Sequence, residues 1–284
     1  MTSTAVLLDD LLFGEGPRWH DGRLWFSDFF RKEVRAVTIG GDVERIAEVP
    51  EQPSGLGFLP DGRLLIASMG DRSVLRRRPD GSLVRHADLS NVATGAVNDL
   101  LTDSLGRTYV GNFGAPDSAT PGAFLPTSIA LVHQDGTVVG AADGLAFPNG
   151  MAFAGDGNTL LVAETYGSRI TAFTVDHTSG RLGERRTWAD LPGVHPDGVA
   201  LDANGNLWVA DPPNRQCLLV SEGGAVVGSV VTRYPCIAPC LGGPSGHTLF
   251  LCTSAWPDAT VRRLDTDPVG LIETIEVAAP AMGW

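Results

Sequence analysis

Acidic, amide and hydroxyl side chains recur at one position of a repeated motif in this sequence, and oxygen atoms of these types can bind a divalent cation. The motif occurs as EGPRW, SGLGF, NDLLT, NGMAF, DGVAL and PCLGG. In four of the six copies a glycine follows at once, which lets the backbone turn tightly and approach another chain segment. The residues at the shared position are Glu15, Ser54, Asn98, Asn149, Asp197 and Pro239.

Five of these six residues are polar, and polar groups are costly to bury unless they are paired. A bound cation would satisfy all five at once. Oxygen ligands without sulfur favour calcium, with magnesium and manganese as alternatives, and zinc also accepts carboxylates. The competing explanation is a water-filled channel whose polar rim forms hydrogen bonds to solvent.

A strand-like segment follows each copy of the motif, and these segments recur at a regular distance. Each consists of a turn and an apolar run that ends in a small or polar residue. The equivalent positions within them are Leu24, Leu64, Thr108, Leu160, Leu207 and Leu249. Their spacings of 40, 44, 52, 47 and 42 residues match the length of a four-stranded propeller blade.

The repeat predicts an all-β protein, a six-bladed β-propeller with four antiparallel strands per blade, as a single domain over residues 1–284. A second hairpin is expected after each of these segments, as in 34–49, and 261–277 should close the sixth blade. Residues 5–10 should join the last blade as an outer strand. Blade symmetry would then place the polar ring, and a metal site, on the central axis. A β-sandwich or two stacked domains are the alternatives, but neither needs a fixed period.

Composition narrows the range of partners. The net charge is −12, with 33 acidic and 21 basic residues, which argues against binding to nucleic acid or to anionic membranes. No apolar run approaches the ~18 residues of a membrane span, and the first residues lack the basic start of a signal peptide. Four cysteines in 284 residues do not form a disulfide scaffold. We therefore expect a cytoplasmic protein with a small-molecule partner.

Several stretches together resemble the family of gluconolactonases, senescence marker protein (regucalcin) and luciferin-regenerating enzymes. They are FGEGPRW, AVNDLLTDSLGRTYVGNFG, FPNGMAF, AETYGSRI, HPDGVALDANGNLWVAD and CLGGPSGHTLFLCTS, which lie between residues 13 and 254. The resemblance implies a six-bladed propeller with one divalent metal ion on its axis. It also implies hydrolysis of lactones of sugar acids and of related esters.

Carried over residue by residue, the resemblance assigns the metal ligands to Glu15, Asn149 and Asp197. Asn98 matches a family asparagine that lies beside the metal and contacts the substrate, and Asp197 matches the proposed catalytic aspartate. One departure concerns Ala96, because sugar lactonases often have an arginine there that binds substrate hydroxyls. A less polar lactone or ester therefore becomes a candidate substrate.

The predicted activity is metal-dependent hydrolysis of a lactone, with Asp197 as general base and Asn98 holding the substrate or the developing charge. Ser54 and His195 are further candidates for substrate binding, although a loop histidine that is hydrogen-bonded to its neighbours is the simpler explanation for His195. A phosphotriesterase or other esterase on the same scaffold is the enzymatic alternative. A non-catalytic propeller that serves as a binding module is the other.

Other side chains favour structural roles. Asp28, Glu164 and Asp211 end equivalent strands and should cap turns or bind neighbouring blades. Cys240 directly follows a ring position and should be a small apolar filler, and no zinc-type partner accompanies it and Cys236. The insertion at 113–127, which contains two phenylalanines, could cover the pocket and determine specificity.

Overall fold

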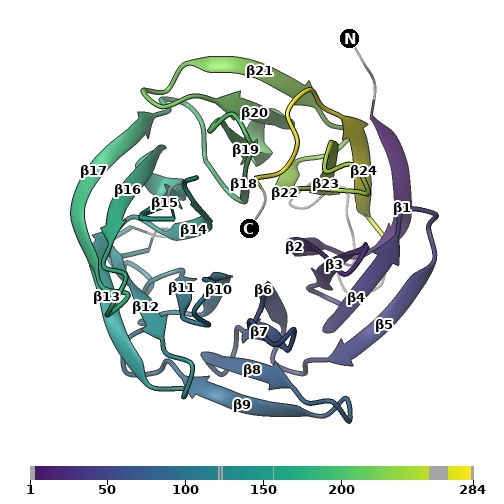
Figure 1. Ribbon diagram of the computed structural model, residues 1–284. Helices are drawn as coiled ribbons and strands as arrows, with labels where there is room; N and C mark the ends of the chain where they lie inside the picture. Colours follow the sequence, from purple (N-terminus) through teal and green to yellow (C-terminus); the bar gives the residue numbers. More distant parts are fainter. Residues whose placement is uncertain (1–3, 121, 123, 156, 256–267, 283–284) are drawn as a thin grey trace.

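The chain forms six four-stranded antiparallel sheets that surround a central axis like the blades of a propeller (Figure 1). The computed structural model describes residues 4–120, 122, 124–155, 157–255 and 268–282. In this part of the chain 24 strands and two short 3₁₀ helices are found. The all-β six-bladed propeller that the repeat predicts is therefore confirmed.

Five blades follow chain order from the axis to the rim. Blade 1 comprises β2 (Gly14–His20), β3 (Arg23–Asp28), β4 (Glu33–Thr38) and β5 (Val43–Glu48). Blade 2 comprises β6 (Pro53–Phe58), β7 (Leu64–Ser68), β8 (Ser73–Arg77) and β9 (Leu83–Asp88). Blade 3 comprises β10 (Val97–Thr102), β11 (Thr108–Asn112), β12 (Thr127–Val132) and β13 (Val138–Leu145). Blade 4 comprises β14 (Pro148–Phe153), β15 (Thr159–Glu164), β16 (Arg169–Val175) and β17 (Leu182–Asp190), with the helix η1 (Thr165–Gly167) after β15. Blade 5 comprises β18 (Val199–Leu201), β19 (Leu207–Asp211), β20 (Gln216–Val220) and β21 (Val226–Val231), with η2 (Pro212–Asn214) after β19.

The sixth blade joins the two ends of the chain. It contains β22 (Cys236–Gly242), β23 (Thr248–Ser254), β24 (Gly270–Glu276) and, as its outer strand, β1 (Ala5–Leu11). The outer strand predicted at 5–10 is thus confirmed. The hairpin expected within 261–277 is corrected: β24 is the one strand described there, residues 261–267 lie outside the described residues, and β1 supplies the fourth strand.

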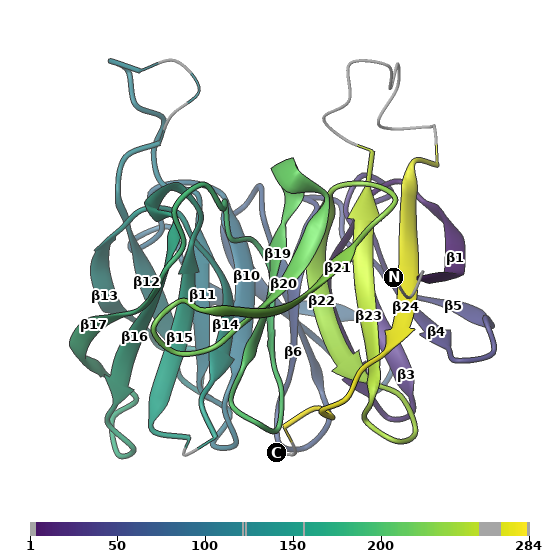
Figure 2. The same ribbon diagram turned by 90° about the horizontal axis from the view of Figure 1, so that it is seen from above.

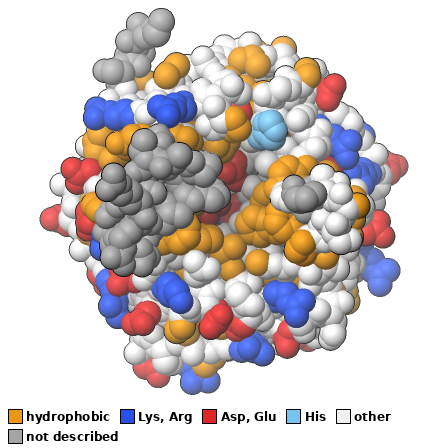
Figure 3. Space-filling view, turned by 180° about the vertical axis from the view of Figure 1, so that it is seen from behind, with side chains coloured by type: hydrophobic (Ala, Val, Ile, Leu, Met, Phe, Trp, Pro, Cys, Tyr) orange, Lys and Arg blue, Asp and Glu red, His pale blue; other side chains and the backbone are white. Residues whose placement is uncertain are grey.

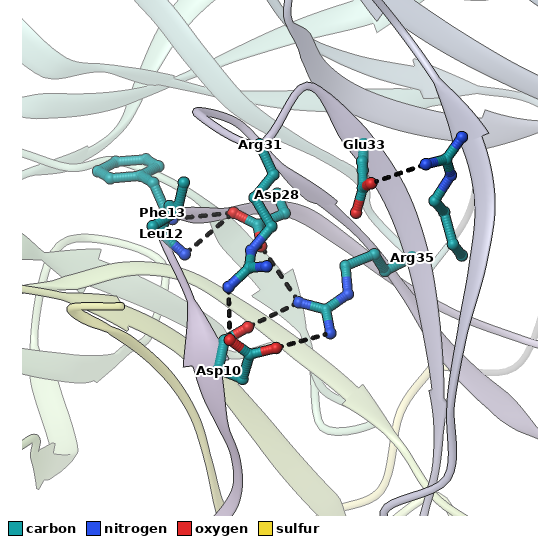
Figure 4. A network of polar contacts seen from close by, with 8 residues as sticks. Asp10, Leu12, Phe13, Asp28, Arg31, Glu33 and Arg35 are labelled. Atoms are coloured by element: carbon teal, nitrogen blue, oxygen red, sulfur yellow. Dashed lines mark hydrogen bonds and ion pairs between the residues drawn. The ribbon is translucent and has the colours of Figure 1, made fainter. Parts of the chain in front are cut away.

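A polar network fastens β1 to blade 1 (Figure 4). The buried carboxylate of Asp28, at the end of β3, accepts hydrogen bonds from the backbone N–H groups of Leu12 and Phe13, each at 3.1 Å. The Arg35 guanidinium lies 3.2 Å from the Asp28 carboxylate and donates to the backbone carbonyl of Asp10 at 2.6 Å. The first strand of blade 1 is therefore held where it starts, close to the axis.

The same arrangement recurs in other blades and agrees with the capping role expected for these acids. Glu164, at the end of β15, accepts a hydrogen bond from the backbone N–H of Ala146 at 2.8 Å and forms ion pairs with Arg169 and Arg185, each at 2.9 Å. In blade 5, Asp211 accepts a hydrogen bond from the backbone N–H of His195 at 3.4 Å. Each carboxylate fixes the loop that leads into its own inner strand.

Apolar cores lie between neighbouring blades. One cluster combines Leu161 and Trp188 of blade 4 with Leu207 and Leu218 of blade 5, and five further clusters fill the other interfaces between blades. Burial of this apolar surface is the main driving force that holds the inner strands in place.

The inner strands of all six blades start at one end of the axis, which we call the ring face (Figure 2). The loop between β11 and β12 rises from this face, whereas the C-terminus lies at the opposite face. Among the described residues, no helix has the length and hydropathy that crossing a bilayer requires.

Candidate functional site

Five polar side chains from five blades come together where the inner strands start. Glu15 lies in β2, Ser54 in β6, Asn98 in β10 and Asn149 in β14, and Asp197 stands just before β18. The first four are buried, whereas Asp197 is only partly buried. The structure therefore brings together the residues that the repeat selected, and we call them the ring. The sixth repeat position is Pro239 in β22.

A β-bulge accompanies the ring position in four inner strands. The register between the first and second strands of the blade shifts between Glu15 and Arg18 in β2, and similar shifts occur in β6, β10 and β14. A bulge inserts an extra residue and redirects the side chains next to it. The strands can therefore turn polar groups toward the axis and still pair regularly further along.

The glycine after the ring residue allows adjacent inner strands to approach closely. An added Cβ would lie 2.7 Å from the Ser54 carbonyl oxygen at Gly16, and 2.6 Å from the Val199 nitrogen at Gly150. Similar backbone clashes would arise at Gly55 and Gly198. Glycine is therefore required there by the packing of one blade against the next. At Gly16 a positive φ of 55° adds a second reason.

Hydrogen bonds link the polar ring residues across blades 2 to 5. Ser54 Oγ donates to Asn98 Oδ1 at 3.0 Å, and Asn98 Nδ2 donates to Asn149 Oδ1 at 2.9 Å. Asn149 Nδ2 in turn donates to Thr165 Oγ1 at 3.2 Å. A hydrogen bond involving the Asn149 side chain also reaches Asp197 and lowers the pKa of that acid. The two amides are therefore held in fixed orientations.

Glu15 is the least satisfied member of the ring. Its Oε2 atom is buried and has no hydrogen-bond partner among the described residues. Burial, followed by the negative charges of Asp197 and Asp99, raises the pKa of Glu15 well above its usual range. The Arg18 guanidinium opposes this shift. That guanidinium is already engaged, because it lies 2.9 Å from the Asp99 carboxylate and donates to the Leu100 carbonyl at 2.7 Å.

Asp197 is perturbed in the same direction. Although the residue as a whole is partly exposed, burial raises the pKa of its carboxyl to about 7, and the charge of Asp99 adds to the shift. The hydrogen bond with Asn149 opposes it. The pKa values of both acids are raised, and one carboxylate oxygen has no partner among the described residues. A positive charge near these two carboxylates would therefore stabilise their ionised forms.

The donor set suits a hard divalent cation, which prefers carboxylate and amide oxygens. The structure itself does not show a metal site: in the described part of the chain, no group of three or more His, Cys, Asp and Glu side chains is arranged to hold a metal ion. The predicted ligands are two carboxylates and one amide. The metal site on the axis therefore remains a prediction, supported by the unpartnered oxygen of Glu15.

Sequence reasoning missed three residues of this region. Arg18 and Asp99 form the ion pair that acts on Glu15, and Thr165 orients Asn149. Asp99 directly follows a ring residue, at the position where four other blades have glycine, and this difference was the available signal. Simple alternation of side chains along a strand could not predict that Arg18 lies near Glu15. The β-bulge in β2 shifts the register between these two residues.

The other described residues that the sequence singled out lie outside the hydrogen-bonded ring. His195 is exposed at the ring face, and Ala96 is partly buried just before β10. All four cysteines are free and buried, and Cys240 packs in the core between blades 6 and 1, as predicted for an apolar filler. Trp256 lies outside the described residues.

A large cavity lies away from the ring. It has a volume of about 920 Å³ and is lined by residues from the far ends of the inner strands, including Trp19, Phe58 and Phe153, together with Met282 near the C-terminus. It therefore opens at the opposite face, and none of the five polar ring residues lines it. We place the candidate chemistry at the ring, because the unpartnered carboxylate is there.

Comparison with known proteins agrees with this fold. The 6-deoxy-6-sulfogluconolactonase of Pseudomonas putida is 24% identical over 264 residues, which cover 89% of this chain and 87% of that protein. A solved luciferin-regenerating enzyme superposes with a TM-score of 0.82 at 19% identity, covering 98% and 97% of the two chains. Regucalcin from Agrobacterium tumefaciens, described as a calcium-binding protein, gives a TM-score of 0.78 at 24% identity, covering 100% and 98%. At these identities the two structures show the fold alone.

Residues 13–255 also match the family described as SMP-30/gluconolactonase/LRE-like region. This match covers most of the chain, and it confirms the family resemblance that the stretches between residues 13 and 254 predicted. Members of the family are named as lactonases, which supports an enzyme that hydrolyses lactones in general terms. The chain belongs to the SMP-30/gluconolactonase/LRE-like family.

Proposed function

We propose that this protein hydrolyses the ester bond of a lactone at the ring, with one divalent cation held by Glu15, Asn149 and Asp197. The observation that carries the proposal is the buried Glu15 carboxylate, whose Oε2 atom has no partner among the described residues. Burying an unpaired charge is costly, so a site of this kind needs a cation. Calcium is favoured, because the ligands are hard oxygens and a structural neighbour is described as calcium-binding. Zinc, manganese and magnesium remain alternatives.

Asp197 is the proposed general base. When bound, the cation would supply Lewis-acid polarisation of the lactone carbonyl. The Asp197 carboxylate would take the proton of the attacking water, which is the task of a general base. Without a cation, burial raises the pKa of this carboxyl to about 7, and a bound cation would lower the pKa and keep the carboxylate ionised. Asn98 uses one N–H for Asn149, and its amide carries a second N–H that can hold the carbonyl oxygen as negative charge develops.

Ser54 and His195 are proposed to contact the substrate. Ser54 donates to Asn98 and so also fixes the orientation of that amide. His195 stands two residues before Asp197 on the exposed ring face, where it can reach a bound molecule. The proposed partner is a small lactone or ester, and a cytoplasmic location remains a prediction from the sequence.

The test is hydrolysis of a panel of lactones, simple esters and phosphotriesters by protein treated with EDTA and then reloaded with calcium, zinc, manganese or magnesium. We expect EDTA to abolish lactone hydrolysis and one of these ions to restore it, with about one metal equivalent bound. Glu15→Gln should lower metal content, whereas the exposed Glu51→Gln should not.

Preferential turnover of phosphotriesters would support the esterase alternative instead. Absence of any turnover, with no metal bound and no change in melting temperature on metal addition, would favour a binding module.

A further inference from the structure

A second layer of residues lies at the ring-face ends of the first two strands of each blade. In each blade it contains the residue two positions before the ring residue and the residue that follows the second strand. In four blades the backbone N–H of the latter donates to the carbonyl of the former; Phe29 to Phe13 at 2.8 Å and Phe113 to Ala96 at 3.0 Å are two examples. We call this layer the collar. Its members are Phe13, Phe29, Gln52, Met69, Ala96, Phe113, Phe147, Thr165, His195, Pro212, Ile237 and Ala255.

The collar lacks fixed charge. None of its twelve residues is Asp, Glu, Lys or Arg, and Gln52, Thr165 and His195 are its polar members. The Thr165 hydroxyl is already occupied, because it donates to the Pro196 carbonyl at 2.8 Å and accepts from Asn149. The strand ends next to the ring residues are therefore mostly apolar.

Aromatic rings concentrate on one side of this entrance. Phe113 stacks on Phe147 with ring centroids 4.5 Å apart, and Phe147 lies 5.3 Å from Tyr166. Phe124, from the loop between β11 and β12, stacks on Tyr166 at 6.2 Å. Phe147 has a φ of 59°, which is unusual for a bulky residue and persists only where the surroundings impose it. The left-handed conformation of Phe147 therefore sets the direction of the chain immediately before Pro148 and the ring residue Asn149.

A smaller aromatic group lies in blade 1, whereas the first group belongs to blades 3 and 4. Phe13 lies 5.5 Å from Phe29 and 5.7 Å from Phe30, and all three are partly exposed. Figure 3 shows the resulting face, in which hydrophobic side chains gather on both sides of a central hollow and acidic side chains are visible inside it. Apolar surface of this kind beside a polar centre marks a binding site.

We propose that the substrate is a lactone that carries an aromatic or similarly large apolar substituent, which packs against Phe113, Phe124, Phe147 and Tyr166 while the ester reaches the ring. The inference rests on the proposed function. A polyhydroxylated lactone would bring several hydroxyl groups into a layer with few free partners, and each desolvated hydroxyl without a partner weakens binding. An apolar substituent would instead gain binding free energy, because it buries apolar surface against the same side chains.

The experiment compares three six-membered lactones: δ-valerolactone, its phenyl-substituted derivative and glucono-δ-lactone. The ratio of kcat/KM values between two substrates does not depend on the amount of folded or metal-loaded protein, so it isolates recognition. We expect the metal-reloaded protein to favour the phenyl derivative over each of the others by about 10- to 100-fold, the amount that burial of a phenyl-sized group supplies.

Two variants test the origin of this preference. Phe113→Ser and Phe124→Ser should each reduce the phenyl-to-hydroxylated ratio by about 10-fold. Phe58→Ser is the matched control, because Phe58 is a partly buried aromatic residue that lines the cavity at the opposite face. It should leave the ratio unchanged. A preference for glucono-δ-lactone, or an unchanged ratio in both Phe113→Ser and Phe124→Ser, would overturn the proposal.

Calorimetric binding of the phenyl-substituted δ-valerolactam, which resists hydrolysis, separates this inference from the proposed function. Binding to the wild type that is weakened in Phe113→Ser, together with no hydrolysis of any lactone, would reject the reaction and support the apolar recognition. Hydrolysis of lactones without binding of the phenyl lactam would reject the recognition and support the reaction. Failure of both would overturn both.

Discussion

Glu15 and Asp197 lie close enough for the charge of Asp197 to raise the pKa of Glu15, and burial raises the pKa of both. At the scale of the residue this makes the acids poor anions in the absence of a cation. The nearby Arg18 is committed to Asp99. Proton binding and metal binding should therefore compete at the ring, because either one removes the same unfavourable negative charge.

Replacement of Asp197 by Asn separates its two proposed tasks. The amide keeps an oxygen donor and the size of the side chain but cannot accept the proton. We expect Asp197→Asn to retain metal but to lack the general base, so turnover should fall by roughly 10²–10⁴-fold.

 Asn98→Ala is the comparison variant: it should weaken substrate binding or stabilisation of the oxyanion while metal content is preserved. Turnover and metal content measured on both variants check the assignment. A fully active, metal-loaded Asp197→Asn protein would remove the general base.

The repeat predicted which residues occupy the ring, because blade symmetry places equivalent positions at equal distance from the axis. It did not predict the Arg18–Asp99 ion pair, which depends on the bulge in β2 and on contact between blades 1 and 3. The unpartnered oxygen of Glu15 was equally out of reach, since it depends on the orientation of every neighbouring side chain.

At the scale of the element, the first strands β2, β6 and β14 each combine a bulge with a glycine. The bulge turns the polar side chain toward the axis, and the glycine lets the next inner strand pass close by. The two features depend on each other, because an inner strand that was pushed outward would carry its ring residue away from its neighbours.

Gly150→Ala tests this arrangement. The added Cβ would lie 2.6 Å from the Val199 nitrogen and 2.7 Å from the Asp197 carbonyl oxygen, and both are backbone atoms that cannot move alone. We expect a loss of about 1–3 kcal/mol in the free energy of unfolding, together with lower turnover, because Asn149 and Asp197 would move. Gly140→Ala is the matched control, since a Cβ there meets nothing within 4 Å. Denaturant unfolding of both variants is the measurement, and equal stability would contradict the packing role of Gly150.

The elements themselves were largely predictable, because the 40- to 52-residue period fixed the number of blades. The sixth blade was the exception. Its fourth strand is β1, so the hairpin pattern that identified the other blades had no counterpart within 261–277. The pairing of the two chain ends was nevertheless predicted, because an outer strand from residues 5–10 would lock the ring of blades, and β1 does pair with β24.

At the scale of the whole molecule, stability depends on contacts between blades and on the carboxylates that anchor the loops. Glu164 is the clearest case. Burial alone would raise its pKa, but the hydrogen bonds from Arg169, Ala146 and Thr171 and the charge of Arg185 lower the pKa from 4.5 to about 2. Because the folded-state pKa is depressed, the contribution of Glu164 is fully present above pH 4.5 and is lost as the pH falls toward 2.

Glu164→Gln should therefore lower the free energy of unfolding at pH 7 by about 1–3 kcal/mol, since hydrogen bonds to a charged group are lost. The difference from the wild type should shrink as the pH falls from 4.5 to 2. Urea unfolding of both proteins across this pH range is the measurement. A difference that stays constant with pH would show that ionisation of Glu164 does not contribute.

The pairing of β1 with β24 also has a consequence for synthesis on the ribosome. β1 is the first strand of the fold to be translated, and its partner ends at Glu276, so at typical elongation rates it waits roughly 15–50 s for that partner. An unpaired strand edge can associate with other nascent chains during this interval. Asp9 and Asp10, which are exposed in β1, place negative charge on that edge, and such charges oppose pairing with a wrong partner. We therefore expect these two aspartates to protect the growing chain from aggregation before the propeller can close.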